Sequence, residues 1–172
     1  MIGFRTEGAP ATVSLGRQFA AIVRAGDVLV LSGDLGAGKT QLTKGLASGL
    51  DVPETVTSPT FNILLVHQGR LPLYHFDLYR LERSDELEDV DYWGTLEADG
   101  VCVVEWGDRF PDAMPIDYLA ARIAITGDET REITLSSFGS RGADLLHEWM
   151  DASRTLSGVT VRMSDEEDGA SA

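Results

Sequence analysis

A short stretch rich in glycine and ending in lysine and threonine has the spacing required for phosphate chemistry. Residues 33–40 match the pattern G-x-x-x-x-G-K-T. Glycines let the backbone turn tightly, so that successive N–H groups point into one hollow and hold phosphate oxygens. Lys39 would reach the β- and γ-phosphates, and the Thr40 hydroxyl would bind Mg²⁺. The nucleotide-binding residues predicted in this way are Gly33, Asp34, Leu35, Gly36, Ala37, Gly38, Lys39 and Thr40.

The sequence on both sides of this loop supplies the elements that must position it. Residues 28–31 form a short apolar run, which predicts a strand buried on both faces. Leucines recur every four residues from 42 to 50 and predict a helix over about 39–50, whose N-terminus carries partial positive charge toward the phosphates. We expect Gly45 and Gly49 to let this helix pack closely against a sheet. A chance match in a glycine-rich turn is the alternative, and the two flanks argue against it.

Two further strands are predicted to end in acidic residues. The apolar run 101–104 ends at Glu105, the Walker B arrangement in which a carboxylate holds Mg²⁺ directly or through water, although aspartate is more usual there. Trp106 follows, and it either packs in the core or borders the nucleotide. The strand predicted at 72–76 runs into Asp77, placed where functional groups gather in α/β sheets; a turn-forming aspartate is the alternative.

The remaining pattern predicts alternating helices and strands. The chain would begin with an edge strand or loose lead-in over 1–11, then a helix from Thr12 or Ser14 to Gly26 that could wall an adenine pocket. Residues 51–61 contain two prolines and four hydroxyl side chains and predict either a plain connection or a nucleotide-sensing loop. Further segments are a hairpin over 61–67 and 72–76, a helix over 84–97 starting at Ser84, a hairpin over 119–126 and 131–138, and a helix over 142–150.

Length and charge narrow the function classes. The chain has 172 residues, which suits one domain, predicted over 1–152, followed by an acidic tail over 153–172 expected to be disordered. A net charge of −14 disfavours direct nucleic-acid binding. The single cysteine excludes a disulfide framework. Because no apolar run reaches membrane-spanning length, we expect the protein to be cytoplasmic. The three histidines are too dispersed for zinc, and His75, although on one strand face with Asp77, is expected to be structural.

Four fragments together resemble one family. They are residues 33–40, 57–61, 75–81 and 104–106, and their order and spacing are similar to those of the TsaE (YjeE) family of small bacterial P-loop ATPases in tRNA threonylcarbamoyladenosine synthesis. The segment H-x-D-L-Y-R-L is the most distinctive, because generic P-loop proteins lack it. The resemblance runs from about residue 12 to about residue 138.

This resemblance implies a fold and a function. The fold would be a P-loop NTPase-like α/β three-layer sandwich with a mixed, mostly parallel central sheet and a C-terminal hairpin. The activity would be ATP hydrolysis that drives the cycle of the TsaD and TsaB transferase pair, with tRNA reached only through these partners and no role at a membrane. The implied cofactors are ATP and Mg²⁺, the metal being held by Thr40 and Glu105. The implied catalytic residues are Lys39, Thr60, Asp77 and Glu105, with Trp106 beside the nucleotide.

We consider three alternative functions for this sequence. A small-molecule kinase would need paired arginines in a lid, and Arg80, Arg83 and Arg109 are dispersed. A GTPase would need N-K-x-D for guanine, whereas the only asparagine, Asn62, is followed by isoleucine. A non-catalytic nucleotide-sensing scaffold is the third. Because no arginine is evident in or beside the phosphate loop, we expect hydrolysis to be slow in isolation and stimulated by a partner.

Overall fold

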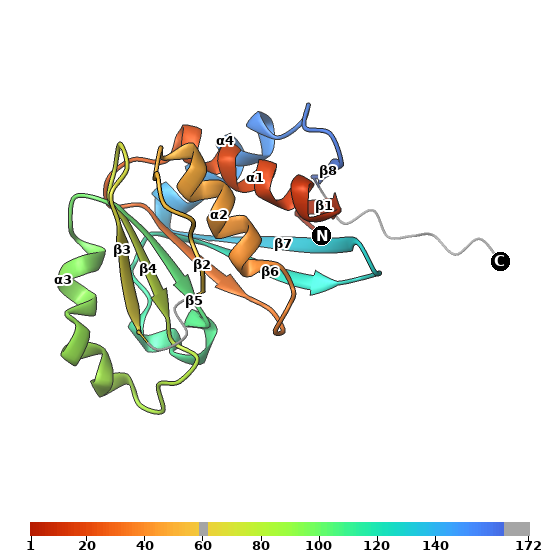
Figure 1. Cartoon of the computed structure of the whole chain (residues 1–172). Helices are drawn as coiled ribbons and strands as arrows, with labels where there is room; N and C mark the ends of the chain where they lie inside the picture. Colours follow the sequence, from red (N-terminus) through yellow and green to blue (C-terminus); the bar gives the residue numbers. More distant parts are fainter. Residues whose placement is uncertain (59–61, 164–172) are drawn as a thin grey trace.

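The computed structural model describes residues 1–58 and 62–163, which form one mixed sheet flanked by helices (Figure 1). The strand order is β3-β4-β5-β2-β6-β7-β1-β8. The strands are β1 (Gly3–Glu7), β2 (Val28–Ser32), β3 (Leu64–His67), β4 (Leu73–Asp77), β5 (Val101–Glu105), β6 (Tyr118–Ile125), β7 (Thr130–Phe138) and β8 (Val159–Arg162). The α-helices are α1 (Ala9–Ile22), α2 (Lys39–Gly49), α3 (Tyr92–Leu96) and α4 (Gly139–Ala152). Short 3₁₀ helices are η1 (Ser84–Val90), η2 (Gly107–Arg109) and η3 (Pro111–Ala113).

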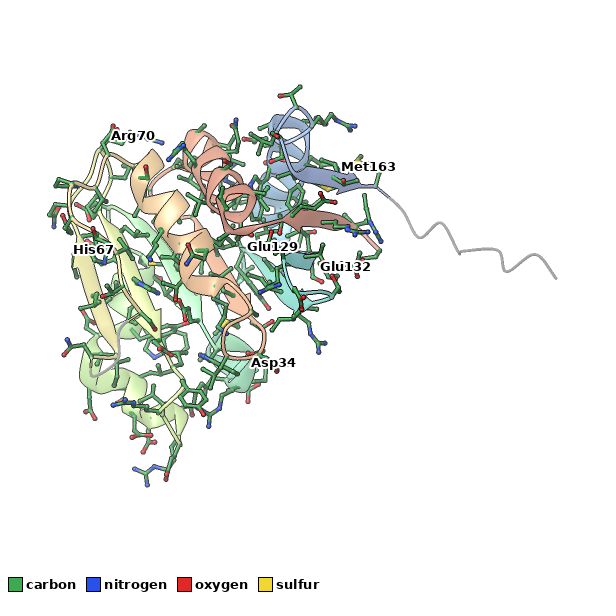
Figure 2. The ribbon with its side chains drawn as sticks, turned by 45° about the vertical axis from the view of Figure 1, so that its right-hand side comes forward. Asp34, His67, Arg70, Glu129, Glu132 and Met163 are labelled. Carbon is green, nitrogen blue, oxygen red and sulfur yellow. The ribbon has the colours of Figure 1, made fainter. Side chains whose placement is uncertain are left out.

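Strand direction changes from the centre of the sheet to its edges. The four central strands, β4, β5, β2 and β6, are parallel. On one flank β3 pairs antiparallel with β4, and on the other β7, β1 and β8 continue antiparallel from β6. Figure 2 shows His67 and Met163 at opposite ends of this arrangement. The predicted mixed α/β sheet with a parallel centre and a β6–β7 hairpin is confirmed.

Helices cover the two faces of the sheet unequally and give three layers. α1, α2 and α4 lie on one face, and α3 with η1 lies on the other (Figure 1). Trp149 of α4 is fully buried in the larger core, where its ring contacts Phe4 and Phe19 at centroid distances of 5.0 and 4.6 Å. Its indole N–H donates to the Leu15 carbonyl oxygen at 2.9 Å, so the polar atom of this large side chain is satisfied. Within the described residues, no helix is long and apolar enough to span a bilayer.

Gly45 and Gly49 of α2 lie against helix α1 and not against the sheet. A Cβ added to Gly45 would collide with the Val13 carbonyl oxygen of α1, and one added to Gly49 would meet the Ala20 side chain. The expectation that these glycines allow close packing against a sheet is therefore wrong. They instead bring α2 against α1, which fixes the helix that follows the phosphate loop.

The two ends of the fold also differ from expectation. Helix α1 begins at Ala9, before Thr12, with Pro10 in its first turn, where the missing N–H has no intrahelical partner to lose. β1 lies between β7 and β8 and is not an edge strand. β8 pairs with β1, so the folded chain continues beyond residue 152, where the domain was expected to end. Residues 164–172 of the expected acidic tail lie outside the described residues.

The single helix predicted over 84–97 is divided in two. Asp91 has φ 49 and separates η1 from α3. The start of η1 is stabilised by the Glu86 carboxylate, which accepts hydrogen bonds from the backbone N–H groups of Glu82 and Arg83 at 2.9 and 2.8 Å. The start of this segment is therefore capped by Glu86, its third residue, rather than by Ser84 as predicted.

Candidate nucleotide-binding site

The carboxyl ends of three parallel strands bring the predicted functional residues to one edge of the sheet. The phosphate loop follows β2, while Asp77 and Glu105 end β4 and β5. These two acids are register partners, and Leu31 of β2 is the partner of Glu105 on the other side. Ligands of open α/β sheets bind outside the carboxyl ends of the strands, so the topology itself assembles the candidate site.

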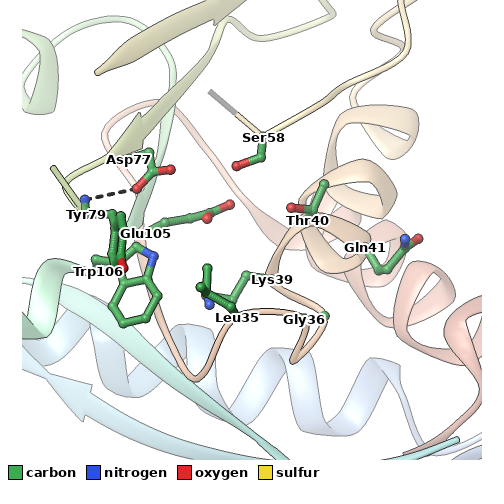
Figure 3. Close-up of a pocket in the computed structure, with 11 residues that line it drawn as sticks. Leu35, Gly36, Lys39, Thr40, Gln41, Ser58, Asp77, Tyr79, Glu105 and Trp106 are labelled. Carbon is green, nitrogen blue, oxygen red and sulfur yellow. Dashed lines mark hydrogen bonds between the residues drawn. The ribbon is translucent and has the colours of Figure 1, made fainter. Parts of the chain in front are cut away.

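A cavity of about 210 Å³ opens at this edge (Figure 3). It is lined by Leu35, Gly36, Gly38, Lys39, Thr40, Gln41, Ser58, Asp77, Tyr79, Glu105 and Trp106. Gly33, Asp34 and Ala37 belong to the loop without lining the cavity, and the predicted residue Thr60 lies outside the described residues. Gln41, Ser58 and Tyr79 were not singled out from the sequence. Ser58 lies in the hydroxyl-rich segment whose proximity to a nucleotide was left open.

The loop backbone adopts conformations that favour glycine. Gly33 and Gly38 have φ values of 139 and 117, and α2 begins directly after Gly38. A Cβ on Gly33 would collide with the carbonyl oxygen of Ile123 in β6. Gly33 is therefore needed because of both backbone conformation and space, and Gly38 because of its backbone conformation.

The Lys39 ammonium group spans the loop that carries it. Its Nζ atom donates to the carbonyl oxygens of Gly33 at 2.6 Å and Asp34 at 3.0 Å, and it lies 4.4 Å from the centroid of the Trp106 ring. Burial lowers the pKa of Lys39, and the negative charges of Glu105 and Asp77 oppose that effect. The amine is thus held at the cavity wall, where a phosphate oxygen can replace a carbonyl oxygen as its acceptor.

Trp106 forms one wall of the cavity. It has a left-handed backbone conformation with φ 63, which is unusual for a bulky residue. Its backbone N–H donates to the Leu31 carbonyl oxygen at 2.9 Å. Its ring lies 4.9 Å from that of Tyr79. Of the two roles left open for Trp106, the structure places its half-buried side chain at the cavity rather than fully inside the core.

The two acids at the strand ends have different surroundings. Glu105 is buried, and its Oε1 lies 2.9 Å from Nε2 of His75. Asp77 accepts a hydrogen bond from the Tyr79 backbone N–H at 3.0 Å. Burial raises the pKa of Asp77, the hydrogen bond from Tyr79 opposes the rise, and the Glu105 charge adds to it. Asp77 therefore does both things that were predicted as alternatives: it accepts a hydrogen bond within a turn, and it lines the cavity.

The donor set at the cavity fits a magnesium ion that arrives with a nucleotide. Figure 3 shows the side chains of Thr40, Ser58 and Glu105 pointing toward a common space. Mg²⁺ prefers oxygen ligands and is usually bound by one or two protein groups together with substrate phosphates and water. Among the described residues, no group of three or more His, Cys, Asp or Glu side chains could hold a metal ion.

A second cavity, of about 300 Å³, lies across the loop from the first and shares Gly36, Gly38 and Gln41 with it. Most of its other walls come from Gly8 and the start of α1 (Ala9 and Thr12), and from the β6–β7 turn (Asp128 and Glu129) with Arg131 of β7. The element upstream of the loop therefore walls a cavity beside it, while its predicted role in an adenine pocket stays a prediction.

The structure also places an arginine beside the phosphate loop, contrary to expectation. Arg131 Nε donates to the Ala37 carbonyl oxygen at 2.9 Å, and its Nη1 donates to that of Gly127 at 3.0 Å. Arg131 and Ala37 are far apart in the sequence, so no local sequence pattern could predict their contact. The guanidinium group connects the β6–β7 turn to the loop.

Comparison with known proteins identifies the family. The family model described as "Threonylcarbamoyl adenosine biosynthesis protein TsaE" matches residues 6–133. The chain belongs to the TsaE family. It is 44% identical over 139 residues to the tRNA threonylcarbamoyladenosine biosynthesis protein TsaE of Bacillus subtilis, covering 80% of this chain and 87% of that protein. The TsaE protein of Streptomyces coelicolor is 47% identical over 137 residues, which cover 75% of this chain and 92% of that protein.

A solved structure supports the fold of this TsaE family member. The crystal structure of Bacillus subtilis YdiB superposes with a TM-score of 0.70 at 37% sequence identity, covering 88% of this chain and 97% of that one. The predicted family and fold class are confirmed.

Proposed function

We propose that this chain is the ATPase subunit of the tRNA threonylcarbamoyladenosine modification machinery and that ATP hydrolysis drives the cycle of a TsaD–TsaB transferase pair. One observation carries the proposal. Lys39, Thr40 and Glu105, which come from a glycine-rich loop and a neighbouring strand, line a single cavity at the carboxyl edge of the sheet. Membership of the TsaE family supports the pathway and the partners.

The phosphates would lie on the loop backbone with Lys39 beside them. Lys39 would exchange the carbonyl oxygen of Gly33 or Asp34 for the β- and γ-phosphate oxygens. Thr40 and Glu105 would hold Mg²⁺, which neutralises the charge that develops on the phosphate oxygens during transfer to water. Trp106 and Tyr79 would exclude bulk water on one side.

Asp77 would orient the attacking water. Its carboxylate lines the same cavity as Lys39 and is fixed by the Tyr79 backbone N–H. Its raised pKa makes it a better proton acceptor than an exposed aspartate. The adenosine end of the nucleotide would lie in the second cavity, between the start of α1 and the β6–β7 turn.

The charges around the site support stimulation by a partner. Four acidic residues act electrostatically on Lys39, namely Asp34, Asp77, Glu105 and Asp108. Arg131 is occupied by backbone carbonyl groups, and the Arg109 guanidinium donates to the Tyr79 carbonyl oxygen. Charge that develops on the γ-phosphate is therefore poorly balanced in the isolated chain, and a cationic group from a partner would stabilise it.

Reconstitution with purified TsaD, TsaB, tRNA, a preformed activated threonylcarbamoyl donor and ATP tests the proposal. Two readouts are needed, phosphate release and formation of the modified nucleoside over several turnovers. We expect both to require this chain, and we expect Lys39→Ala and Glu105→Gln to reduce phosphate release by about 100-fold or more. Glu88→Gln, an exposed acid of η1, is the matched control and should leave both readouts unchanged. Formation of a phosphorylated metabolite in place of free phosphate would overturn the proposal in favour of a kinase.

A further inference from the structure

His75 of β4 is a polar side chain in an apolar environment. Its side chain is fully buried, and its neighbours Leu73 and Phe76 are fully buried as well. An imidazole in such a place destabilises the fold unless its nitrogen atoms form hydrogen bonds. Its Nε2 lies 2.9 Å from Oε1 of Glu105, whereas its buried Nδ1 has no hydrogen-bond partner among the described residues. The contact with Glu105 is therefore what accounts for a histidine at this position.

The unpartnered nitrogen indicates which ring nitrogen carries the hydrogen. An ionised carboxylate can only accept, so Nε2 of His75 donates to Glu105. With the hydrogen on Nε2, Nδ1 is a bare acceptor. A hydrogen on Nδ1 would instead leave a buried donor without an acceptor and place a nitrogen lone pair against the carboxylate, both of which are unfavourable. A ring with its hydrogen on Nε2 fits the surroundings best.

The contact restrains the side chain that lines the cavity. Glu105 has three rotatable side-chain bonds, and a carboxylate at this position could turn away from a metal ion. His75 engages its Oε1, and the carboxylate end points into the space that Thr40 and Ser58 also face (Figure 3). His75 itself does not line that cavity. Hydrogen bonds from such outer groups orient metal-binding carboxylates and raise metal affinity.

We propose that His75 is a positioning residue whose Nε2–H holds the Glu105 carboxylate in the orientation that receives Mg²⁺ bound to the nucleotide. This role rests on the proposed function, because it presupposes the metal between Thr40 and Glu105. His75 contributes to metal affinity rather than to nucleotide affinity as such, since the phosphate loop and Lys39 do not depend on it.

The chain contains a matched control. His67 of β3 is also buried, and its Nδ1 lies 3.0 Å from Oε1 of Glu54, a half-exposed side chain. Neither residue lines the nucleotide cavity. Loss of His67 therefore removes a comparable histidine–carboxylate contact without touching the proposed metal site.

The test measures metal and nucleotide binding separately. Mn²⁺, followed by electron paramagnetic resonance, replaces Mg²⁺ in the presence of a saturating non-hydrolysable ATP analogue, and a fluorescent ATP analogue is titrated in EDTA. His75→Leu removes the donor. His75→Gln can place an amide N–H near the original Nε2, and His75→Asn is polar but too short to do so. We expect Mn²⁺ affinity to fall about 10- to 100-fold in the leucine and asparagine variants. The glutamine variant should recover most of it, and affinity for the nucleotide in EDTA should change little in any of them.

The outcomes separate this role from a merely structural one. Wild-type Mn²⁺ affinity in His75→Leu, or equal losses in the glutamine and asparagine variants, would overturn it, and so would an equal loss from His67→Leu. If the leucine variant does not fold, the contrast between glutamine and asparagine decides. If the wild-type chain binds the nucleotide analogue but no Mn²⁺ with it, the proposed metal site fails, and the role of His75 fails with it. A site that binds Mn²⁺ normally but is insensitive to His75 overturns the positioning role alone.

Discussion

At the scale of single residues, the site shows how surroundings give two similar acids different properties. Glu105 is buried against an imidazole donor, whereas Asp77 is fixed by one backbone N–H and faces the cavity. Burial and the neighbouring Glu105 charge both disfavour the ionised form of Asp77. Together with its position at the cavity, this unfavourable ionisation makes Asp77 a candidate functional residue.

Because ionisation of Asp77 is unfavourable in the folded state, we expect Asp77→Asn to stabilise the fold while reducing ATP turnover. The folded-state pKa of Asp77 is raised above its unfolded value, so ionisation destabilises the folded state. The penalty is absent below the unfolded pKa and develops fully as the pH rises through the folded pKa. The asparagine oxygen can still accept from Tyr79. We therefore expect the melting temperature of the variant to exceed that of the wild type at pH of about 8 and the difference to vanish near pH 3.

Calorimetric melts across that range provide the measurement. Asp99→Asn, a change of an exposed acid on the loop before β5, is the control and lies away from the cavity. A wild type more stable than Asp77→Asn at the higher pH would contradict the account of Asp77.

At the scale of elements, the contact between α1 and α2 holds the phosphate loop in place. α2 begins at Lys39, and α1 packs along it so closely that Gly45 has no space for a Cβ. The position of the loop helix thus depends on a small residue well away from the phosphate-binding motif.

We expect Gly45→Ala to lower the free energy of unfolding by about 1–3 kcal/mol, the usual cost of overpacking, despite the better helix propensity of alanine. The new methyl group would collide with the Val13 carbonyl oxygen and force the two helices apart. Chemical denaturation measures the change. Lys44→Ala, a partly exposed position of the same helix, is the control and should be near neutral. An unchanged stability in Gly45→Ala would show that α1 and α2 are not tightly coupled.

The elements that sequence could predict are those with strong local patterns. The apolar runs before Gly33 and Glu105 predict buried strands, and the four-residue leucine repeat predicts α2. The break at Asp91 and the strand β8 were missed, because a single left-handed residue and a four-residue strand leave little periodic signal. The contacts of Arg131 with Ala37 and of His75 with Glu105 join distant parts of the chain, so only the strand order could reveal them.

At the scale of the whole molecule, a mostly buried ion pair joins the last helix to the start of the central strand β2, at the edge of the sheet opposite the phosphate loop. Arg141 of α4 donates from Nε and Nη2 to the two carboxylate oxygens of Asp27, at 2.8 and 2.7 Å. Asp27 directly precedes β2, and neither side chain lines the cavities around the phosphate loop. The pair attaches the C-terminal helix to the start of the central strand.

Removal of one partner should lower global stability without affecting nucleotide binding. We expect Asp27→Ala to cost about 3 kcal/mol, because it removes the two closest acceptors of the mostly buried Arg141 guanidinium and leaves only the half-exposed Glu148 carboxylate, at 3.3 Å, to balance its charge. The exposed pair of Arg154 and Asp151 is the control, and Asp151→Ala should cost less than about 1 kcal/mol. Denaturant titrations with and without a nucleotide analogue measure both effects. Loss of analogue affinity in folded Asp27→Ala would show that this end of the sheet influences the site.

In the proposed function, a triphosphate lies on residues 33–40 with its magnesium ion between Thr40 and Glu105. A crystal structure of the chain with Mg²⁺ and a non-hydrolysable ATP analogue tests it most directly. We expect the β- and γ-phosphates beside Lys39 and a metal ion about 2.1 Å from the Thr40 hydroxyl oxygen, with Glu105 bound to it directly or through one water molecule. An empty cavity, or a nucleotide whose metal ion touches neither residue, would contradict the account.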